Sequence, residues 1–334
     1  MIIVFLVIFA RTIDWTSAWH SIRSASLSLL FAAIAVNFLS IAVKGVRWWL
    51  FLKPAGSPSL GLSMRATIAG SGLNNVLVAN GGDAARVVFV TKATGLPSSR
   101  VLATVALERL FDPVGFVILL VYGALAYKLP DNLAKWTIPA EIGLALIFAL
   151  LGWFVYTSRH SVAMGNHDDR PVHGFLARAK AYFTGFAVST RALTSTSRFA
   201  WALVISMVAW AGQVATFQLA AAAAHVSIPP EASLVALLAT NLGLLVRATP
   251  GNVGFFQFVF ALSVAPFGVS RNDAIAVSLL IQTIQIIPVT LIGIALAPEF
   301  LFRRKTAQAQ ASEPVVLGSP SQKSEELAAV SGET

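Results

Sequence analysis

The sequence predicts an all-α membrane protein, a polytopic bundle of about seven to nine apolar segments with broken or re-entrant helices in a pseudo-symmetric arrangement. Of its 334 residues, 56% are hydrophobic and only 12% are charged, whereas charged residues make up about 25% of a soluble globular domain. Apolar runs long enough to span a bilayer recur between charged loops. Two of these runs are interrupted by glycine and polar residues, which is typical of discontinuous helices around a transport site.

The apolar runs define the expected elements in order along the chain. They cover residues 26–50, 64–80, 101–127, 138–157, 199–224, 232–248, 253–268 and 274–298. A ninth run, Met1 to Ala10, is too short to span and lacks the basic start and cleavage site of a signal peptide. We expect it to be the end of a first helix that begins upstream of Met1.

The distribution of lysine and arginine predicts the orientation. The loop 158–198 carries several basic residues and the connection 225–231 carries none, so the positive-inside rule places the former in the cytoplasm. Four basic residues then fall outside against the rule, which indicates that 64–80 or 232–248 is a re-entrant hairpin. They are Lys44, Arg47, Lys53 and Arg65.

Two domains are expected. Residues 1–305 form the transmembrane domain, in the inner (plasma) membrane. Residues 306–334 are rich in Ser, Gln, Glu, Pro and Gly, and such a segment has too little apolar surface to fold. We therefore expect a disordered tail on the cytoplasmic side.

The first interrupted run contains a candidate headgroup site. Gly81-Gly82 precedes Asp83 and Arg86, so a new helix could begin here and offer free N–H groups to an anion. Asp83 as a plain N-cap is the alternative. We expect Arg86 to bind phosphate, and Asn75 and Asn80 to hydrogen-bond the polar headgroup.

The second interrupted run has the same character. Pro250 prevents the helix from continuing without a kink, and the planar fork of Arg247 is suited to phosphate. A positive-inside anchor is the other interpretation of Arg247. Asn252 and Gln257 complete the candidate ligands. If a two-fold axis in the membrane plane relates the two runs, Gly81 and Gly251 should meet near the midplane.

Three charged residues lie within the run 101–127. Glu108 and Asp112 are four residues apart on one helical face, and Arg109 lies three residues before Asp112. Because a charge inside a membrane costs about 2.5–3.5 kcal/mol, these groups must be paired or hydrated. They are either gating or structural ion pairs, or direct contacts to a headgroup. Gln257, Gln282 and Gln285 are amides of the kind that join helices by hydrogen bonds.

The order of several motifs resembles the lysylphosphatidylglycerol synthase transmembrane family, also called the flippase-like domain family, over about residues 1–298. The motifs are Arg47-Trp48-Trp49, Asn75 with Gly81-Gly82-Asp83 and Arg86, Glu108-Arg109-Leu110-Phe111-Asp112, and Pro250-Gly251-Asn252-Val253-Gly254. The resemblance implies a helical bundle with re-entrant segments that moves or handles lipid between leaflets.

The chain departs from the pattern of that family in three places, one of which is the shortened first helix at Met1 to Ala10. The family often has a glutamate at the position of Gln257 and an arginine near Gln282, so two amides replace an ion pair if these positions face each other. Members that make aminoacylated phosphatidylglycerol carry a soluble transferase domain after the membrane part. The short polar tail here cannot form such a domain, so we expect no synthase activity.

The predicted function is binding of a lipid with an anionic or polyprenyl-type headgroup and its translocation across the inner membrane. The alternative is a non-transporting accessory subunit that docks a lipid-modifying enzyme or a glycosyltransferase. No nucleophile–base–acid set and no metal-ligand spacing is present, so we expect no catalytic residue, metal or cofactor. The expected partners are membrane lipid, a lipid-modifying enzyme or a second copy of the chain. We expect no nucleic acid, because basic loops facing anionic lipid account for the net charge of +9.

Overall fold

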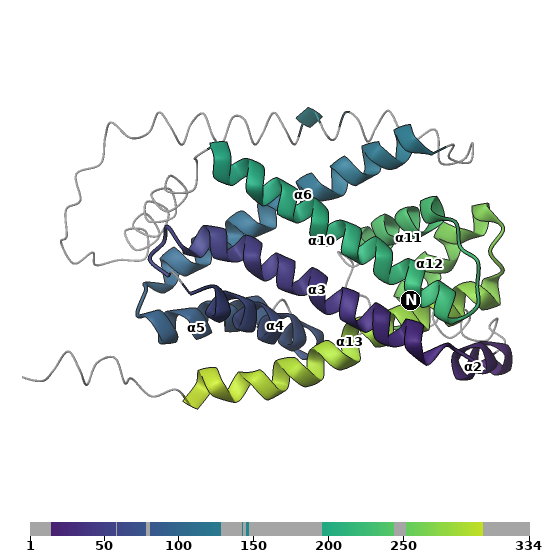
Figure 1. The fold of residues 1–334 in the computed structure, drawn as a ribbon, viewed down its shortest axis with the longest axis horizontal. Helices are drawn as coiled ribbons and strands as arrows, with labels where there is room; N and C mark the ends of the chain where they lie inside the picture. Colours follow the sequence, from purple (N-terminus) through teal and green to yellow (C-terminus); the bar gives the residue numbers. More distant parts are fainter. Residues whose placement is uncertain are drawn as a thin grey trace, which may run out of the picture.

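The chain folds into a bundle of long and short helices (Figure 1). This computed structural model describes residues 15–57, 59–77, 81–127, 142, 145, 146, 196–243 and 252–302. Within them, four helices are long and apolar enough to cross a membrane. These are α3 (Leu27–Leu52), α6 (Ser98–Ala126), α10 (Thr196–Ala223) and α13 (Arg271–Phe302). The prediction of a helical membrane protein is therefore confirmed.

The other helices in the described part of the chain are shorter. They are α2 (Trp15–Arg23), α4 (Leu60–Val76), α5 (Gly81–Thr94), α11 (Pro230–Gly243), α12 (Phe255–Val264) and the 3-10 helix η3 (Ala265–Phe267). Helices α4, α11 and α12 have 17, 14 and 10 residues, fewer than the 20 or so needed to span. The expected runs 64–80, 232–248 and 253–268 thus correspond to short helices, and nearly all of 138–157 lies outside the described residues.

The two halves of the chain repeat one order of elements. A long helix is followed by two short helices and another long one, first α3–α4–α5–α6 and then α10–α11–α12–α13. In each half the two short helices pack against each other as a helical hairpin. A small-residue contact between Gly72 and Gly293 holds α4 closely against α13.

Helices α3 and α10 lie side by side and run in opposite directions (Figure 1). Hydrogen bonds join their ends and middles in antiparallel order. The Ser26 N–H donates to the Ala223 carbonyl (2.9 Å), and the Ser40 hydroxyl donates to the Ala209 carbonyl (2.7 Å). This pair forms the centre of the bundle.

The apolar side chains gather in two separate cores. The first core surrounds Trp48, Val90 and Val101 and contains the α4–α5 hairpin. The second core surrounds Phe217 and Ile275 and contains the α11–α12 hairpin. Each core therefore lies at one end of the bundle with one hairpin.

Candidate functional site

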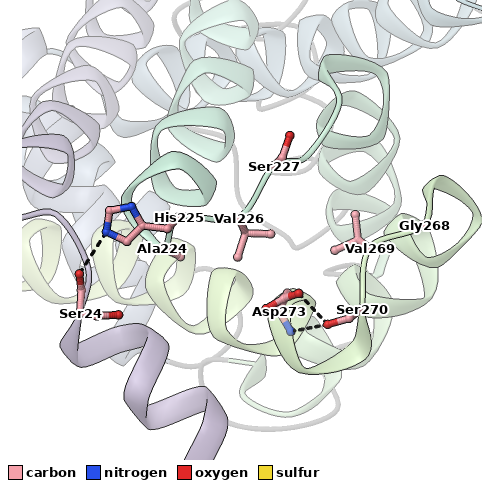
Figure 2. A pocket seen from close by; sticks show the side chains of 9 residues that line it. All are labelled: Ser24, Ala224, His225, Val226, Ser227, Gly268, Val269, Ser270 and Asp273. Carbon is pink, nitrogen blue, oxygen red and sulfur yellow. Dashed lines mark hydrogen bonds between the residues drawn. The ribbon is translucent and has the colours of Figure 1, made fainter.

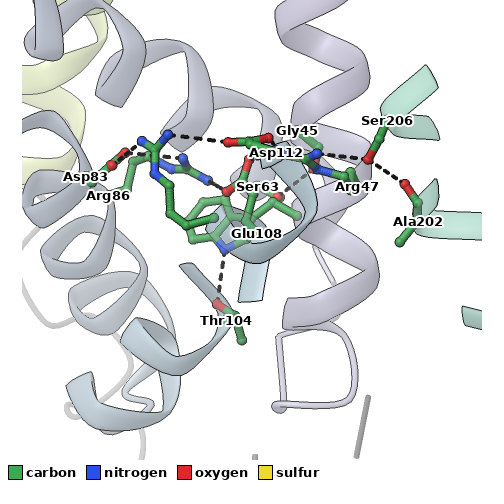
Figure 3. A network of polar contacts seen from close by, with 12 residues as sticks. Gly45, Arg47, Ser63, Asp83, Arg86, Thr104, Glu108, Asp112, Ala202 and Ser206 are labelled. Atoms are coloured by element: carbon green, nitrogen blue, oxygen red, sulfur yellow. Dashed lines mark hydrogen bonds and ion pairs between the residues drawn. The ribbon is translucent and has the colours of Figure 1, made fainter. Parts of the chain in front are cut away.

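A buried cluster of charges joins α3, α5 and α6 (Figure 3). Nη2 of Arg47 lies 3.2 Å from Oε1 of Glu108 and 2.7 Å from Oδ1 of Asp112. The other carboxylate oxygen of Glu108, Oε2, lies 2.6 Å from Nη2 of Arg86. Glu108 thus bridges two guanidinium groups that approach it from different helices.

Asp83 and Arg109 extend this cluster toward the surface. Oδ1 of Asp83 lies 3.5 Å from Nη1 of Arg86, and Oδ2 pairs with Arg109. Arg109 also lies 3.4 Å from Asp112, and its side chain is half exposed. We call Arg47, Asp83, Arg86, Glu108, Arg109 and Asp112 the ion cluster. Its three guanidinium charges balance its three carboxylate charges.

The surroundings of Arg86 explain how a guanidinium is accommodated inside the bundle. The group lies 4.0 Å from the centre of the Trp48 ring, a cation–π geometry. Gly70 leaves the space that the Arg86 side chain crosses, because a Cβ at position 70 would collide with it. Arg86 is 4% exposed. In this structure the guanidinium that was predicted to bind phosphate is instead paired with Glu108 and Asp83.

Helix α5 begins at Gly81, with Asp83 in its first turn, as the sequence predicts. The side chain of Asn74, which sequence reasoning did not choose as a site residue, supports this start. Its Oδ1 accepts a hydrogen bond from the Gly82 N–H (2.8 Å), and its Nδ2 donates to Asp83 (3.3 Å). The side chain of Asn74 therefore accepts the hydrogen bond of one N–H group that was predicted to bind an anion.

The second break is described only in part, since Arg247 and Gly251 lie outside the described residues, as does Asn80 of the first break. Asn252 is buried and has a φ of 53°, a conformation that asparagine tolerates better than most residues. Gln257 accepts from the Gly254 N–H (2.6 Å) and donates to Oε1 of Gln282 (2.6 Å). Gln257 and Gln282 therefore face each other, which was the condition for two amides to replace an ion pair.

A polar cavity of about 190 Å³ lies between the two hairpins, which we call the central cavity. Helices α3, α4, α10, α11 and α13 all contribute to its walls. Its polar lining consists of Asn37, Lys44, Ser71, Asn75, Gln213, Thr240, Asn241 and Gln285. Asn75 lies in the first interrupted run and Asn241 in the second. The structure therefore brings a polar residue from each run to the same cavity.

A chain of amides crosses one wall of the central cavity. Gln285 donates to Oε1 of Gln213 (3.1 Å), and Gln213 donates to Oδ1 of Asn37 (3.5 Å) and to Ser40 (3.2 Å). Asn75 is fixed by a hydrogen bond from its Nδ2 to Thr290 (3.0 Å). The wall is therefore pre-organised by contacts between helices far apart in sequence.

Lys44 is the charged residue of this cavity, and sequence reasoning did not choose it as a site residue. In the sequence it counts only as a basic residue on the unexpected side of the membrane. The signal that could have found it is the spacing of Asn37, Ile41 and Lys44, which puts all three on one face of a helix. All three line the central cavity.

A second hollow, of about 460 Å³, lies at the end of the bundle where α10 passes into α11 (Figure 2). Its polar groups include Ser24, His225, Ser270 and Asp273. His225 is exposed, has a φ of 59° and contacts the Ser24 carbonyl through Nε2 (3.2 Å). These residues come from loops and helix ends, apart from the ion cluster and the central cavity.

Comparison with known proteins identifies the family. The model of the lysylphosphatidylglycerol synthase TM region matches residues 1–293. The chain belongs to this family. A UPF0104 membrane protein of Pyrococcus horikoshii is 24% identical over 299 residues, covering 80% of this chain and 86% of that protein. No solved structure matches. Membership of the lysylphosphatidylglycerol synthase TM region family agrees with the helical membrane architecture. The family model describes a transmembrane region and not an obviously catalytic domain.

Proposed function

We propose that this protein binds the headgroup of an anionic or polyprenyl-type lipid in the central cavity and translocates it across the inner membrane. The observation that carries the proposal is the cavity itself, whose walls combine polar groups from both interrupted runs inside an apolar bundle. Large apolar side chains on the long helices point outward, among them Leu27 and Phe31 at 70% exposed and Leu125 at 76%. The apolar outer surface suits the acyl chains of a lipid, and the polar cavity suits its headgroup.

The helical hairpins α4–α5 and α11–α12 act as re-entrant segments in this proposal. Each is too short to cross as two spans, and the elements repeat as long, short, short, long in both halves. We infer an inverted repeat, with a two-fold axis in the membrane plane passing near the central cavity. Transporters of this kind bind substrate where discontinuous helices of two repeats meet.

A re-entrant α4–α5 hairpin also removes the exception to the positive-inside rule. The loop after α3 and the loop before α6 touch, since a Cβ at Gly56 would lie 3.0 Å from Leu96. Basic residues of both halves then share one end of the bundle, which we place in the cytoplasm with the C-terminal tail. They include Lys53, Arg65, Lys92, Arg100 and Arg198.

The ion cluster serves as the gate of this pathway. It ties α5 of the first hairpin to α3 and α6, so movement of the hairpin requires these pairs to exchange partners. Nε of Arg47 and Nε of Arg86 are buried without a hydrogen-bond partner in the described part of the chain. We propose that Arg86 and Asp83 contact the headgroup when the pairs open, together with Asn80, Arg247, Asn252 and Gln257 of the two breaks.

The family description supports a phospholipid as the substrate, because it names a synthase of lysylphosphatidylglycerol. The test is translocation of a headgroup-labelled phosphatidylglycerol in liposomes, read by quenching from outside. Gln213→Leu removes an amide of the cavity wall. Gln218→Leu is the matched control, since Gln218 lies on the same helix but bonds Ser233 and the loop at Ile228 and Pro229.

We expect wild type and Gln218→Leu to expose the inner-leaflet label and Gln213→Leu to do so more slowly. Melting temperatures of both variants show that each is folded. Equal rates for wild-type and empty liposomes, with labelled phosphatidylglycerol and with a labelled polyprenyl phosphate, would reject translocation. The accessory-subunit function would then be the better description.

A further inference from the structure

We infer that Lys44 holds the phosphate of the bound lipid and that the central cavity therefore selects phospholipids whose headgroup carries a net negative charge. The inference rests on the proposed function for the identity of the ligand as a lipid. It adds the residue that makes the ionic contact and the charge that the ligand must bring.

The balance of charges is the first argument. The ion cluster contains Arg47, Arg86 and Arg109 against Asp83, Glu108 and Asp112, and each of these six groups has a partner inside the cluster. Lys44 interacts electrostatically with the carboxylates of Asp112 and Glu108 and with Arg47 and Arg109, yet among the described residues it makes no direct hydrogen bond or ion pair. The ion cluster is neutral by itself, so the ammonium of Lys44 adds a positive charge that no direct ion pair within the described residues neutralises. A charge in the bundle interior is costly without a close anion or water. The ammonium of Lys44 is therefore available to the anion of a ligand.

The position of Lys44 is the second argument. It lines the central cavity together with Asn37, which is two helical turns earlier on the same face of α3. Nδ2 of Asn37 is buried and has no hydrogen-bond partner in the described part of the chain. Its carbonyl oxygen accepts from Gln213, so the N–H₂ group is the part of this side chain that lacks a partner. Two donors on one face of α3, an ammonium and an amide, are thus unused.

The direction of the amide chain is the third argument. Gln285 donates to Gln213, and Gln213 donates to Asn37, so the N–H₂ group at the end of this chain of amides is that of Asn37, which lines the same cavity as Lys44. A ligand that fits must accept hydrogen bonds and be negatively charged. The nonbridging oxygens of a lipid phosphodiester accept hydrogen bonds in every phospholipid, but only a headgroup with a net negative charge also meets the second requirement.

The size of the central cavity limits what else enters. At about 190 Å³ it is smaller than the roughly 300–1,000 Å³ of pockets that enclose drug-sized ligands. It can hold a phosphate with a short polar substituent but not an acyl chain or an oligosaccharide. The chains of the lipid must lie outside, against the apolar surface of the helices.

The experiment measures lipid binding to the full-length protein by the shift of its melting temperature in detergent. The probes are phosphatidylglycerol, which is anionic, phosphatidylcholine, which has the same phosphate but no net charge, and inorganic phosphate. Lys44→Met removes the charge. Lys53→Met is the matched control, because Lys53 is exposed at the end of the same helix, over the ring of Trp49 (5.0 Å).

We expect phosphatidylglycerol to stabilise wild type and Lys53→Met, and the apparent Kd of Lys44→Met to be weaker by about ten- to a hundredfold, the usual effect of losing a charge-assisted hydrogen bond. Asn37→Leu, which tests the second donor, should weaken binding about tenfold or less. Phosphatidylcholine should stabilise wild type much less than phosphatidylglycerol does.

Three results would overturn the inference. Equal binding of phosphatidylglycerol by wild type and Lys44→Met would exclude Lys44 as the anchor. Equal stabilisation by phosphatidylcholine would exclude selection by charge. The full shift with inorganic phosphate alone would show that the site takes the free anion rather than a lipid. Binding that depends on Lys44 without any translocation in liposomes would instead reject the proposed transport and leave the site intact.

Discussion

Gly72 of α4 and Gly293 of α13 touch through their backbones. A Cβ built on Gly72 would lie 2.8 Å from Cα of Gly293 and 2.5 Å from the Val289 carbonyl, and a Cβ on Gly293 would lie 2.7 Å from Cα of Gly72. Neither position has room for a methyl group. Small residues at a crossing are the common means by which helices in membranes approach closely.

Gly72→Ala should therefore destabilise the protein although alanine is the better helix former. Overpacking at such a contact costs about 1–3 kcal/mol, which should appear as a lower melting temperature in detergent. Gly61→Ala is the control on the same helix, because nothing lies within 4 Å of a Cβ there. An equal melting temperature for Gly72→Ala and wild type would show that α4 and α13 separate easily.

Members of the ion cluster should differ in their contribution to stability according to burial. Glu108→Gln leaves Arg47 and Arg86 without their shared carboxylate charge, and breaking a buried pair in this way costs about 3–5 kcal/mol. Arg109→Ala should cost about 0–1 kcal/mol, since its side chain is half exposed. Equilibrium unfolding in mixed micelles measures both. Equal losses for the two variants would mean that water reaches Glu108 as freely as Arg109.

The amide pair at α12 and α13 should accept a pair of opposite charges but not a single charge. Gln257→Glu alone places an unpaired carboxylate at a position that is 3% exposed, with an expected loss of several kcal/mol. Gln257→Glu with Gln282→Lys should recover much of that stability, because the side chains already meet at 2.6 Å. A double variant that is as unstable as the single one would show that the two positions do not support an ion pair.

The topology can be tested by labelling single cysteines, because the native chain contains none. Lys53→Cys and Lys92→Cys should react with an impermeant maleimide from the same side of the membrane, and Ser227→Cys from the other. All three positions are exposed. If 64–80 were a full span, the cysteines at 53 and 92 would be labelled from opposite sides.

Hydropathy predicted the long helices well, because a span is a local property of the sequence. The predicted run 26–50 corresponds to helix Leu27–Leu52, and the predicted run 101–127 corresponds to helix Ser98–Ala126. Helix α5 was not among the predicted runs, since Asp83, Arg86 and Lys92 make it polar. Arg86 and Asp83 have their charges satisfied by Glu108 and Arg109, partners more than twenty residues away that no local pattern reveals.

The site was predicted less completely than the fold. Asn75, which was chosen from the polar breaks, lines the central cavity, and the ion cluster contains all three charges chosen in 101–127. Lys44 and Gln213 were missed. Their chemistry is ordinary in the sequence, and only the packing of α3 against α10 puts them at one cavity.

The two apolar cores have a consequence for how the chain assembles during synthesis. The first core draws almost all of its side chains from α3 to α6, with a few such as Ala202 from later helices, and the second draws mainly on α10 to α13. The first half can thus bury its apolar groups while the second is still being translated. Two separately expressed polypeptides, divided between α6 and α10, should find each other in the membrane and restore the complete protein.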